Sequence, residues 1–276
     1  MHLLQLEWKK LAPNKMFRVA TLMYLILAPL MYLAVKSSMG DAGEAGEGNA
    51  AVGLMMSHHA FPRIWSTMAY WCSWLTFFLI TYLSAWMVTS EHEYRTARQN
   101  LITGMERSSF LWGKFQMIIV LITGATVYMA LLAFLFGQLE GGSGSVVHHE
   151  MFAIRNFFVQ TFFYSSLAFM FAILFRKGGL AMIFFFSYIL IIERIVYYLF
   201  FLAFLEDTTI GNYMPASSAW FTLPFYFINS NASGFMEGIA NDKIRFLSPD
   251  QVIWVTLGYS LICWGISYWR FNNKDL

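Results

Sequence analysis

Charge is scarce in this sequence. Charged residues make up only 12% of the 276 residues, whereas hydrophobic residues make up 58% and the mean hydropathy is +0.53. Soluble domains rarely have such a composition. The formal net charge of +2 offers no basic or acidic surplus for binding nucleic acid or an acidic polymer. We therefore expect a membrane protein that has no nucleic-acid partner.

Catalytic and metal-binding patterns are also lacking. Cys72 and Cys263 lie inside apolar runs without CxxC or Cys/His spacing, which is typical of small buried side chains. The pairs His58-His59 and His148-His149 lack the i, i+4 spacing of a chelate, so we interpret them as loop residues. The sequence contains neither an H-E-x-x-H run nor a G-x-x-x-x-G-K-S/T phosphate-binding loop. We expect no catalytic, cofactor-binding or metal residue, and hence no enzyme.

Six apolar runs are long enough to cross a bilayer, which takes about 20 residues of helix. They predict one all-α, polytopic transmembrane domain over residues 1–276, without internal repeats or a cleavable signal peptide. The predicted transmembrane helices are 16–35, 64–88, 110–136, 157–175, 180–205 and 252–269.

Lysine and arginine are divided unequally between the connections on the two sides of these spans. One side, which includes both termini, has twelve of them: Lys9, Lys10, Lys15, Arg18, Arg95, Arg98, Arg107, Lys114, Arg176, Lys177, Arg270 and Lys274. The other side has five: Lys36, Arg63, Arg155, Lys243 and Arg245. Because cytoplasmic loops carry the excess of Lys and Arg, we expect both termini in the cytoplasm.

Two segments differ from both spans and ordinary loops. In residues 1–13, Leu3, Leu4, Trp8 and Leu11 share one helical face, which predicts an interfacial helix lying on the cytoplasmic side among membrane lipids. The stretch 206–250 is too apolar for an exposed loop and is interrupted by proline, so we expect short helices in the outer leaflet. By contrast, the glycine-rich, acidic stretch that starts at Lys36 predicts a solvated loop.

The connection between the second and third spans, "SEHEYRTARQNLITGMERSSFLWGKF", concentrates charge in a chain that otherwise has little. Its apolar residues recur at helical spacing, with charged residues on another face, which predicts an amphipathic helix over 91–103. Gly104 is placed to end this helix, and Ser108 or Ser109 to cap the next one. The charges either solvate a cytoplasmic loop or form a docking surface for a soluble partner.

This connection resembles that of ABC-2 type transporter permeases, in which an acidic residue precedes a short amphipathic helix, a glycine, a basic-Ser pair and a lysine. The matching residues are Glu93, Thr96, Gly104, Arg107, Ser108 and Lys114. The resemblance implies that the 91–103 helix couples the chain to an ATPase. The residues it assigns to this coupling are Glu91, Glu93, Tyr94, Arg95, Thr96, Arg98, Gly104 and Arg107.

The same resemblance implies the membrane subunit of an exporter in the cell's inner (plasma) membrane, working as a homodimer or as a heterodimer with a second permease. ATP and Mg would then be bound by separate ABC ATPase subunits, since this chain has no cofactor site. The cargo is left open, although apolar walls favour an amphipathic or hydrophobic one. An alternative is a non-transporting membrane anchor or sensor that docks a cytoplasmic protein.

Glu193 and Arg194 are neighbouring charges near the middle of the fifth predicted span. Ionised groups at that depth cost several kcal/mol unless they are paired or face water. Adjacent residues project about 100° apart on a helix, so at least one of the two must find another partner. They form either an interhelical ion pair or part of the substrate path.

Overall fold

A computed structural model gives the arrangement of most of the chain. It describes residues 2–44, 61–94, 96–102, 104–139, 147–148, 150–196, 199, 213–223 and 249–273. Every regular element in these ranges is a helix, so the predicted all-α class is confirmed for them.

Among the described residues, six helical segments are long and apolar enough to cross a membrane, which agrees with the six predicted spans. They are α2 (Lys15–Glu44), α4 (Ile64–Glu93), α6 (Arg107–Leu139), α7 (Phe152–Phe175), the run Gly178–Val196, and α12 (Pro249–Asn273). The fifth run consists of α8 (Gly178–Ser187), the π-helix η1 (Tyr188–Ile192) and helical residues 193–196. Residues 200–205 of the predicted fifth span lie outside the described ranges.

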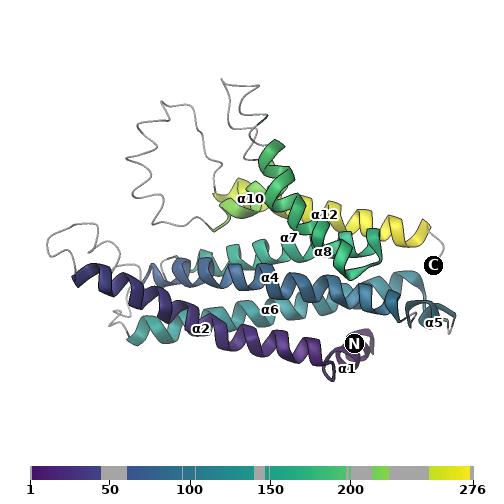
Figure 1. The fold of residues 1–276 in the computed structure, drawn as a ribbon, viewed down its shortest axis with the longest axis horizontal. Coiled ribbons are helices and arrows are strands. Elements are labelled where there is room, and N and C mark those ends of the chain that lie inside the picture. The colour runs from purple at the N-terminus through teal and green to yellow at the C-terminus, as the bar shows by residue number, and fades with distance from the viewer. Residues whose placement is uncertain are drawn as a thin grey trace.

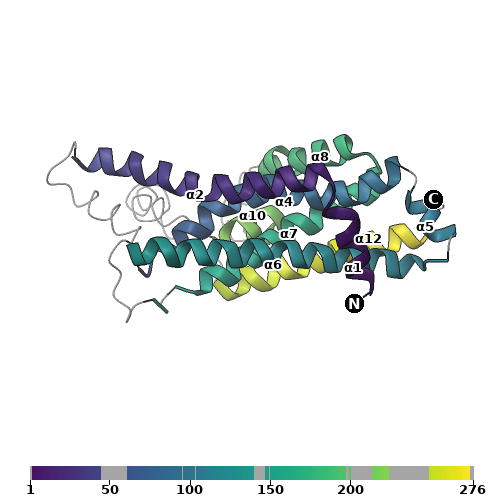
Figure 2. The same ribbon diagram turned by 90° about the horizontal axis from the view of Figure 1, so that it is seen from below.

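The long helices form an elongated bundle with α4 and α7 at its centre (Figures 1 and 2). In the most apolar part of α7, 78% of the residues are buried. In the most apolar parts of α2 and of the run Gly178–Val196, only 22% are buried. The peripheral helices therefore present apolar side chains outwards, as a lipid environment or a second membrane chain requires.

Small hydroxyl side chains allow α4 and α7 to pack closely. Thr76 on α4 and Thr161 on α7 hydrogen-bond through their hydroxyls at 3.2 Å. Buried Ser84 and Thr89 donate to the carbonyls four residues earlier in α4, at 2.9 and 3.2 Å. These local bonds satisfy the hydroxyls without water, and small residues of this kind are typical of helix contacts in membranes.

One loop prediction was wrong in part. The solvated loop was expected to start at Lys36, but α2 continues to Glu44. Glycine and acidic residues weaken a helix only by up to about 1 kcal/mol each, so a long preceding helix can propagate through them.

Two short helices lie at the end of the bundle that carries both termini. Helix α1 (His2–Leu11) lies crosswise beneath α6, and α5 (Thr96–Ile102) follows α4 at the same end (Figures 1 and 2). Gly113 of α6 lies directly against α1, because a Cβ there would be in van der Waals contact with Glu7 Cγ at 3.4 Å. Pro13 follows α1 and Lys15 begins α2, which agrees with the predicted end of the N-terminal helix.

A third short helix, α10 (Pro215–Phe221), packs against α12 and α7. Pro215 occupies its first turn, where the missing N–H costs no hydrogen bond. Together with Pro249 and Asp250, which begin α12, helix α10 is the part of the 206–250 stretch that the structure describes as α-helix, and most of the remainder of that stretch lies outside the described ranges.

Candidate functional site

Four charged side chains form a cluster where α1, α4 and α6 meet. Lys114 Nζ lies 2.5 Å from Glu7 Oε2 and also forms an ion pair with Glu91. Lys10 Nζ lies 3.2 Å from Glu7 and 3.4 Å from Glu91. We call Glu7, Lys10, Glu91 and Lys114 the ion cluster. Its two positive and two negative charges balance, which allows it to be buried.

Burial and charge act in opposite directions on Lys10, which lies on α1 outside the spans. Burial alone would lower the pKa of its ammonium, but the carboxylates of Glu91 and Glu7 outweigh burial and raise the pKa above its ordinary value of 10.5. A raised lysine pKa stabilises the fold at pH values below 10.5. That contribution is lost as the pH rises through the folded-state pKa.

Helix α5 is attached to the ion cluster through Glu91. Asn100 Nδ2 donates to Glu91 Oε2 at 3.5 Å, and the Thr96 hydroxyl donates to the Glu91 carbonyl at 3.4 Å. Gly104 follows α5 with a φ of +99°, a conformation that favours glycine. The Met105 N–H closes the turn on the Asn100 carbonyl at 3.1 Å, so the prediction that Gly104 ends this helix is confirmed.

The predicted 91–103 helix was wrong in its boundaries. Helix α4 continues to Glu93, Tyr94 caps it, and α5 is a separate helix. Glu91 therefore belongs to the second span and is only 8% exposed, so it is not part of a protruding surface. The physical reason is that Lys114 and Lys10, both distant in sequence, neutralise Glu91 and allow the membrane helix to continue.

The other residues assigned to coupling occupy different environments. Glu93 and Tyr94 are exposed, and Thr96 is half-buried. Arg107 Nη1 donates to the Asn272 carbonyl at 2.7 Å, so it caps the end of α12. Arg95, Thr103 and the side chain of Arg98 lie outside the described residues.

The predicted serine cap of the third span was also wrong. Helix α6 begins at Arg107, which places Ser108 and Ser109 within its first turn. The Ser108 hydroxyl donates to the Glu106 carboxylate at 3.3 Å instead of capping the helix.

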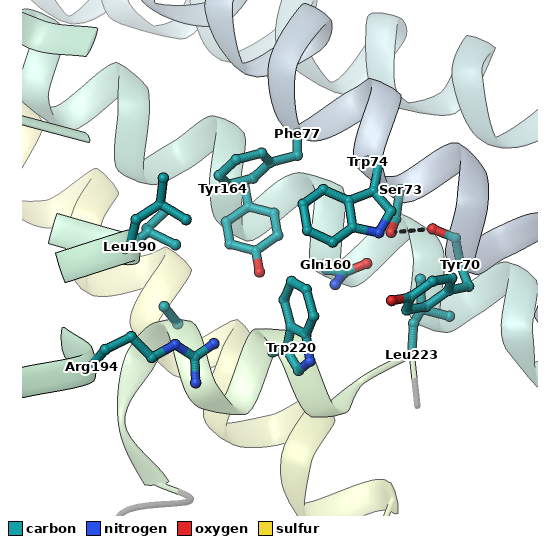
Figure 3. A pocket seen from close by; sticks show the side chains of 12 residues that line it. Tyr70, Ser73, Trp74, Phe77, Gln160, Tyr164, Leu190, Arg194, Trp220 and Leu223 are labelled. Atoms are coloured by element: carbon teal, nitrogen blue, oxygen red, sulfur yellow. Dashed lines mark hydrogen bonds between the residues drawn. The ribbon is translucent and has the colours of Figure 1, made fainter. Parts of the chain in front are cut away.

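Glu193 and Arg194 do not pair with each other. The Glu193 carboxylate accepts the N–H groups of Ala216 at 2.8 Å and Ser217 at 2.6 Å, and thereby caps α10. Glu193 is 4% exposed. The Arg194 guanidinium lies 5.8 Å from the ring centre of Trp220. It points into a pocket between α4, α7, η1 and α10 (Figure 3).

Sequence reasoning missed the ion cluster and the pocket, since both join residues far apart in the chain. Glu7 carried a usable signal, because it is an isolated acid in a helix with lysines. Nothing in the sequence relates Gln160 to Arg194. Among the described residues, no group of three or more His, Cys, Asp or Glu side chains could hold a metal, and His58, His59 and His149 lie outside them.

The bundle defines a class, an all-helical protein that crosses the membrane several times. Residues 53–276 match the family described as "Protein of unknown function (DUF2705)", and the chain belongs to that family. No curated protein matches the chain.

Proposed function

We propose that this chain is the permease subunit of an ABC-2 type exporter and is driven by separate ATPase subunits that bind ATP and Mg. The observation that carries the proposal is the attachment of α5 to the ion cluster. A short helix at the terminal end of the bundle bonds to Glu91, and Glu91 in turn bonds to α1 and α6.

This attachment gives α5 a way to transmit force. The bonds from Asn100 and Thr96 both end on Glu91, which lies within the second membrane helix. A displacement of α5 therefore acts on α4 directly and on α6 and α1 through Lys114. A loop that only solvates its charges has no need of such bonds to a buried carboxylate.

The exposed surface around α5 suits a protein partner. Tyr94 is 75% exposed and Ile102 is 76% exposed, at an end of the bundle that Lys and Arg assign to the cytoplasm. Large apolar side chains exposed to water favour contact with another protein. We place the ATPase on this surface.

The rest of the proposal concerns the assembly. A homodimer or heterodimer of permeases in the inner membrane forms a path between its subunits. Helix α1 of each subunit lies among lipids at the interface between membrane and cytoplasm. Closure of the ATPases moves α5 and shifts the balance between two packings of the bundle. This chain itself performs no catalysis. The alternative is an anchor or sensor that uses the same surface without transport.

Affinity purification from native membranes, followed by an ATP hydrolysis assay, tests the proposal. We expect an ATPase to be isolated with the wild-type chain. The amount of ATPase isolated with the double variant Tyr94→Ala, Ile102→Ala should be at least tenfold lower. Leu139→Ala is the matched control, because Leu139 is equally exposed at the opposite end of the bundle. A stable cytoplasmic partner without hydrolysis would favour the anchor, and retention of the ATPase by the double variant would reject α5 as its docking site.

A further inference from the structure

The pocket between α4, α7, η1 and α10 has the form of a ligand site. The space inside it that a water molecule can reach is about 40 Å³, so it admits the end of a molecule rather than a whole drug-sized ligand, and it continues into open space at its mouth. Leu190 of η1, which is 56% exposed, lies at its edge. The pocket therefore communicates with the surroundings of the bundle.

Aromatic side chains contribute five of the twelve residues that line the wall. The rings of Trp74 and Trp220 meet edge to face at 5.2 Å, and Phe77 packs against Tyr164 at 5.0 Å. Figure 3 shows these rings surrounding the space between α4 and α10. A wall of this kind favours an apolar or amphipathic molecule.

Arg194 adds a positive charge to this apolar wall. Within the described part of the chain it forms no ion pair, and its contact is with the face of Trp220. The neighbouring Glu193 carboxylate is fully engaged with the N–H groups of α10. The guanidinium is therefore available to an anion, which it binds through a planar set of donors.

Gln160 provides a second, independent observation. This residue of α7 is 4% exposed and lines the pocket, yet its Oε1 has no hydrogen-bond partner among the described residues. Buried polar atoms almost always have partners, so an orphaned acceptor that faces a pocket indicates a missing donor. A hydroxyl group on a ligand is such a donor.

A π-helical turn immediately precedes the two adjacent residues that serve different partners. Ile189 and Leu190 line the pocket from η1, whose wider turn immediately precedes Glu193 and Arg194. A π-helical turn changes the helical register, and such turns are frequent at functional sites. After this turn, Glu193 binds the N–H groups of α10 and Arg194 lines the pocket.

We propose that this pocket binds an anionic amphiphile whose head group carries a hydroxyl. Arg194 binds the anionic group, Gln160 Oε1 accepts a hydrogen bond from the hydroxyl, and the aromatic wall packs the apolar part. The source of this ligand is either a membrane lipid or an amphipathic cargo molecule. The assignment stands on the pocket alone and does not require coupling to an ATPase.

Native mass spectrometry of the purified full-length protein, titrated with three probes, tests the assignment. The probes are dioctanoyl phosphatidylglycerol, which has every required group, dioctanoyl phosphatidylcholine, which is zwitterionic, and glycerol 3-phosphate, which lacks the tails. We expect phosphatidylglycerol to bind at least tenfold more tightly than either of the others. Equal binding of phosphatidylcholine or of glycerol 3-phosphate would overturn the proposal.

Variants then locate the site. Arg194→Gln should weaken phosphatidylglycerol binding at least tenfold and Gln160→Leu about threefold or more, because each removes one recognised group. Arg155→Gln is the control, since Arg155 is an exposed arginine whose ion pair with Asp250 lies outside the pocket. Wild-type binding in both pocket variants would overturn the proposal. If Arg194→Gln does not elute as a folded protein, Arg194→Lys and Gln160→Leu decide the question.

The molecules that remain bound to the protein after its extraction from the membrane show whether the ligand is a lipid or a cargo molecule. Retention of an anionic phospholipid by the wild type, and retention of about threefold less of it by Gln160→Leu, would assign the site to lipid. An empty site that still binds added phosphatidylglycerol would assign it to a free amphiphile, which fits a cargo molecule.

Discussion

Lys114 illustrates how a membrane bundle retains a buried charge. The side chain is 2% exposed, and its ammonium is held by carboxylates from two other helices, Glu7 of α1 and Glu91 of α4. The net value of such a cluster is small, because desolvation offsets most of the attraction. Its consequence is that removal of a single member leaves an uncompensated charge.

We predict that Lys114→Met destabilises the protein by about 3–5 kcal/mol, because it leaves Glu7 and Glu91 buried with only the half-exposed Lys10 to neutralise them. Unfolding in detergent, followed by size-exclusion chromatography, measures the loss. Adding Glu7→Gln and Glu91→Gln to Lys114→Met should restore most of the stability.

Lys177→Met is the control for this prediction, since Lys177 is exposed and its loss should change stability by no more than about 0.5 kcal/mol. If Lys114→Met is as stable as the control variant Lys177→Met, the ion cluster does not stabilise the contact between α1, α4 and α6.

Helix α1 provides a test at the scale of an element, because its crosswise position places it against a particular turn of α6. A Cβ at position 113 would lie 3.8 Å from Cβ of Leu3, and disulfides have Cβ separations of about 3.5–4.5 Å. We predict that the pair Leu3→Cys, Gly113→Cys forms a disulfide under mild oxidation. The measurement is a mobility shift after proteolysis between the two positions.

The pair Leu3→Cys, Gly124→Cys is the control. A Cβ at Gly124 has no neighbour within 4 Å, and it lies about 16 Å further along α6. The native Cys72 and Cys263 are buried and should not interfere. Equal cross-linking of both pairs would show that α1 does not rest on α6 as described.

The elements also show which parts of the fold can be predicted from sequence. Apolar runs such as 64–88 are local, and the left-handed turn at Gly104 depends on one residue, so both could be read directly. The end of α4 could not, because Glu91 continues the helix only with Lys114 and Lys10 in place to neutralise it. The same is true of the pocket, where Gln160 and Arg194 come together through packing of α7 against the fifth run.

The whole molecule is asymmetric in charge along the bundle axis. The N-terminus, α5 and the C-terminus lie at one end (Figure 1), and the connections at that end carry most of the lysines and arginines. The cytoplasmic excess of these residues sets membrane topology. This asymmetry determines whether α5 faces the compartment that contains ATP.

We predict that both termini are cytoplasmic. Epitope tags at the N- and C-terminus should be labelled by antibody only after the membrane that contains the protein is permeabilised, whereas a tag inserted within residues 45–60 should be labelled before that step. The inserted tag is the matched control, because it reports on the opposite side of the same molecule. Labelling of the terminal tags while that membrane is intact would place α5 away from ATP, and would reject coupling to an ATPase while leaving the anionic-amphiphile site untouched.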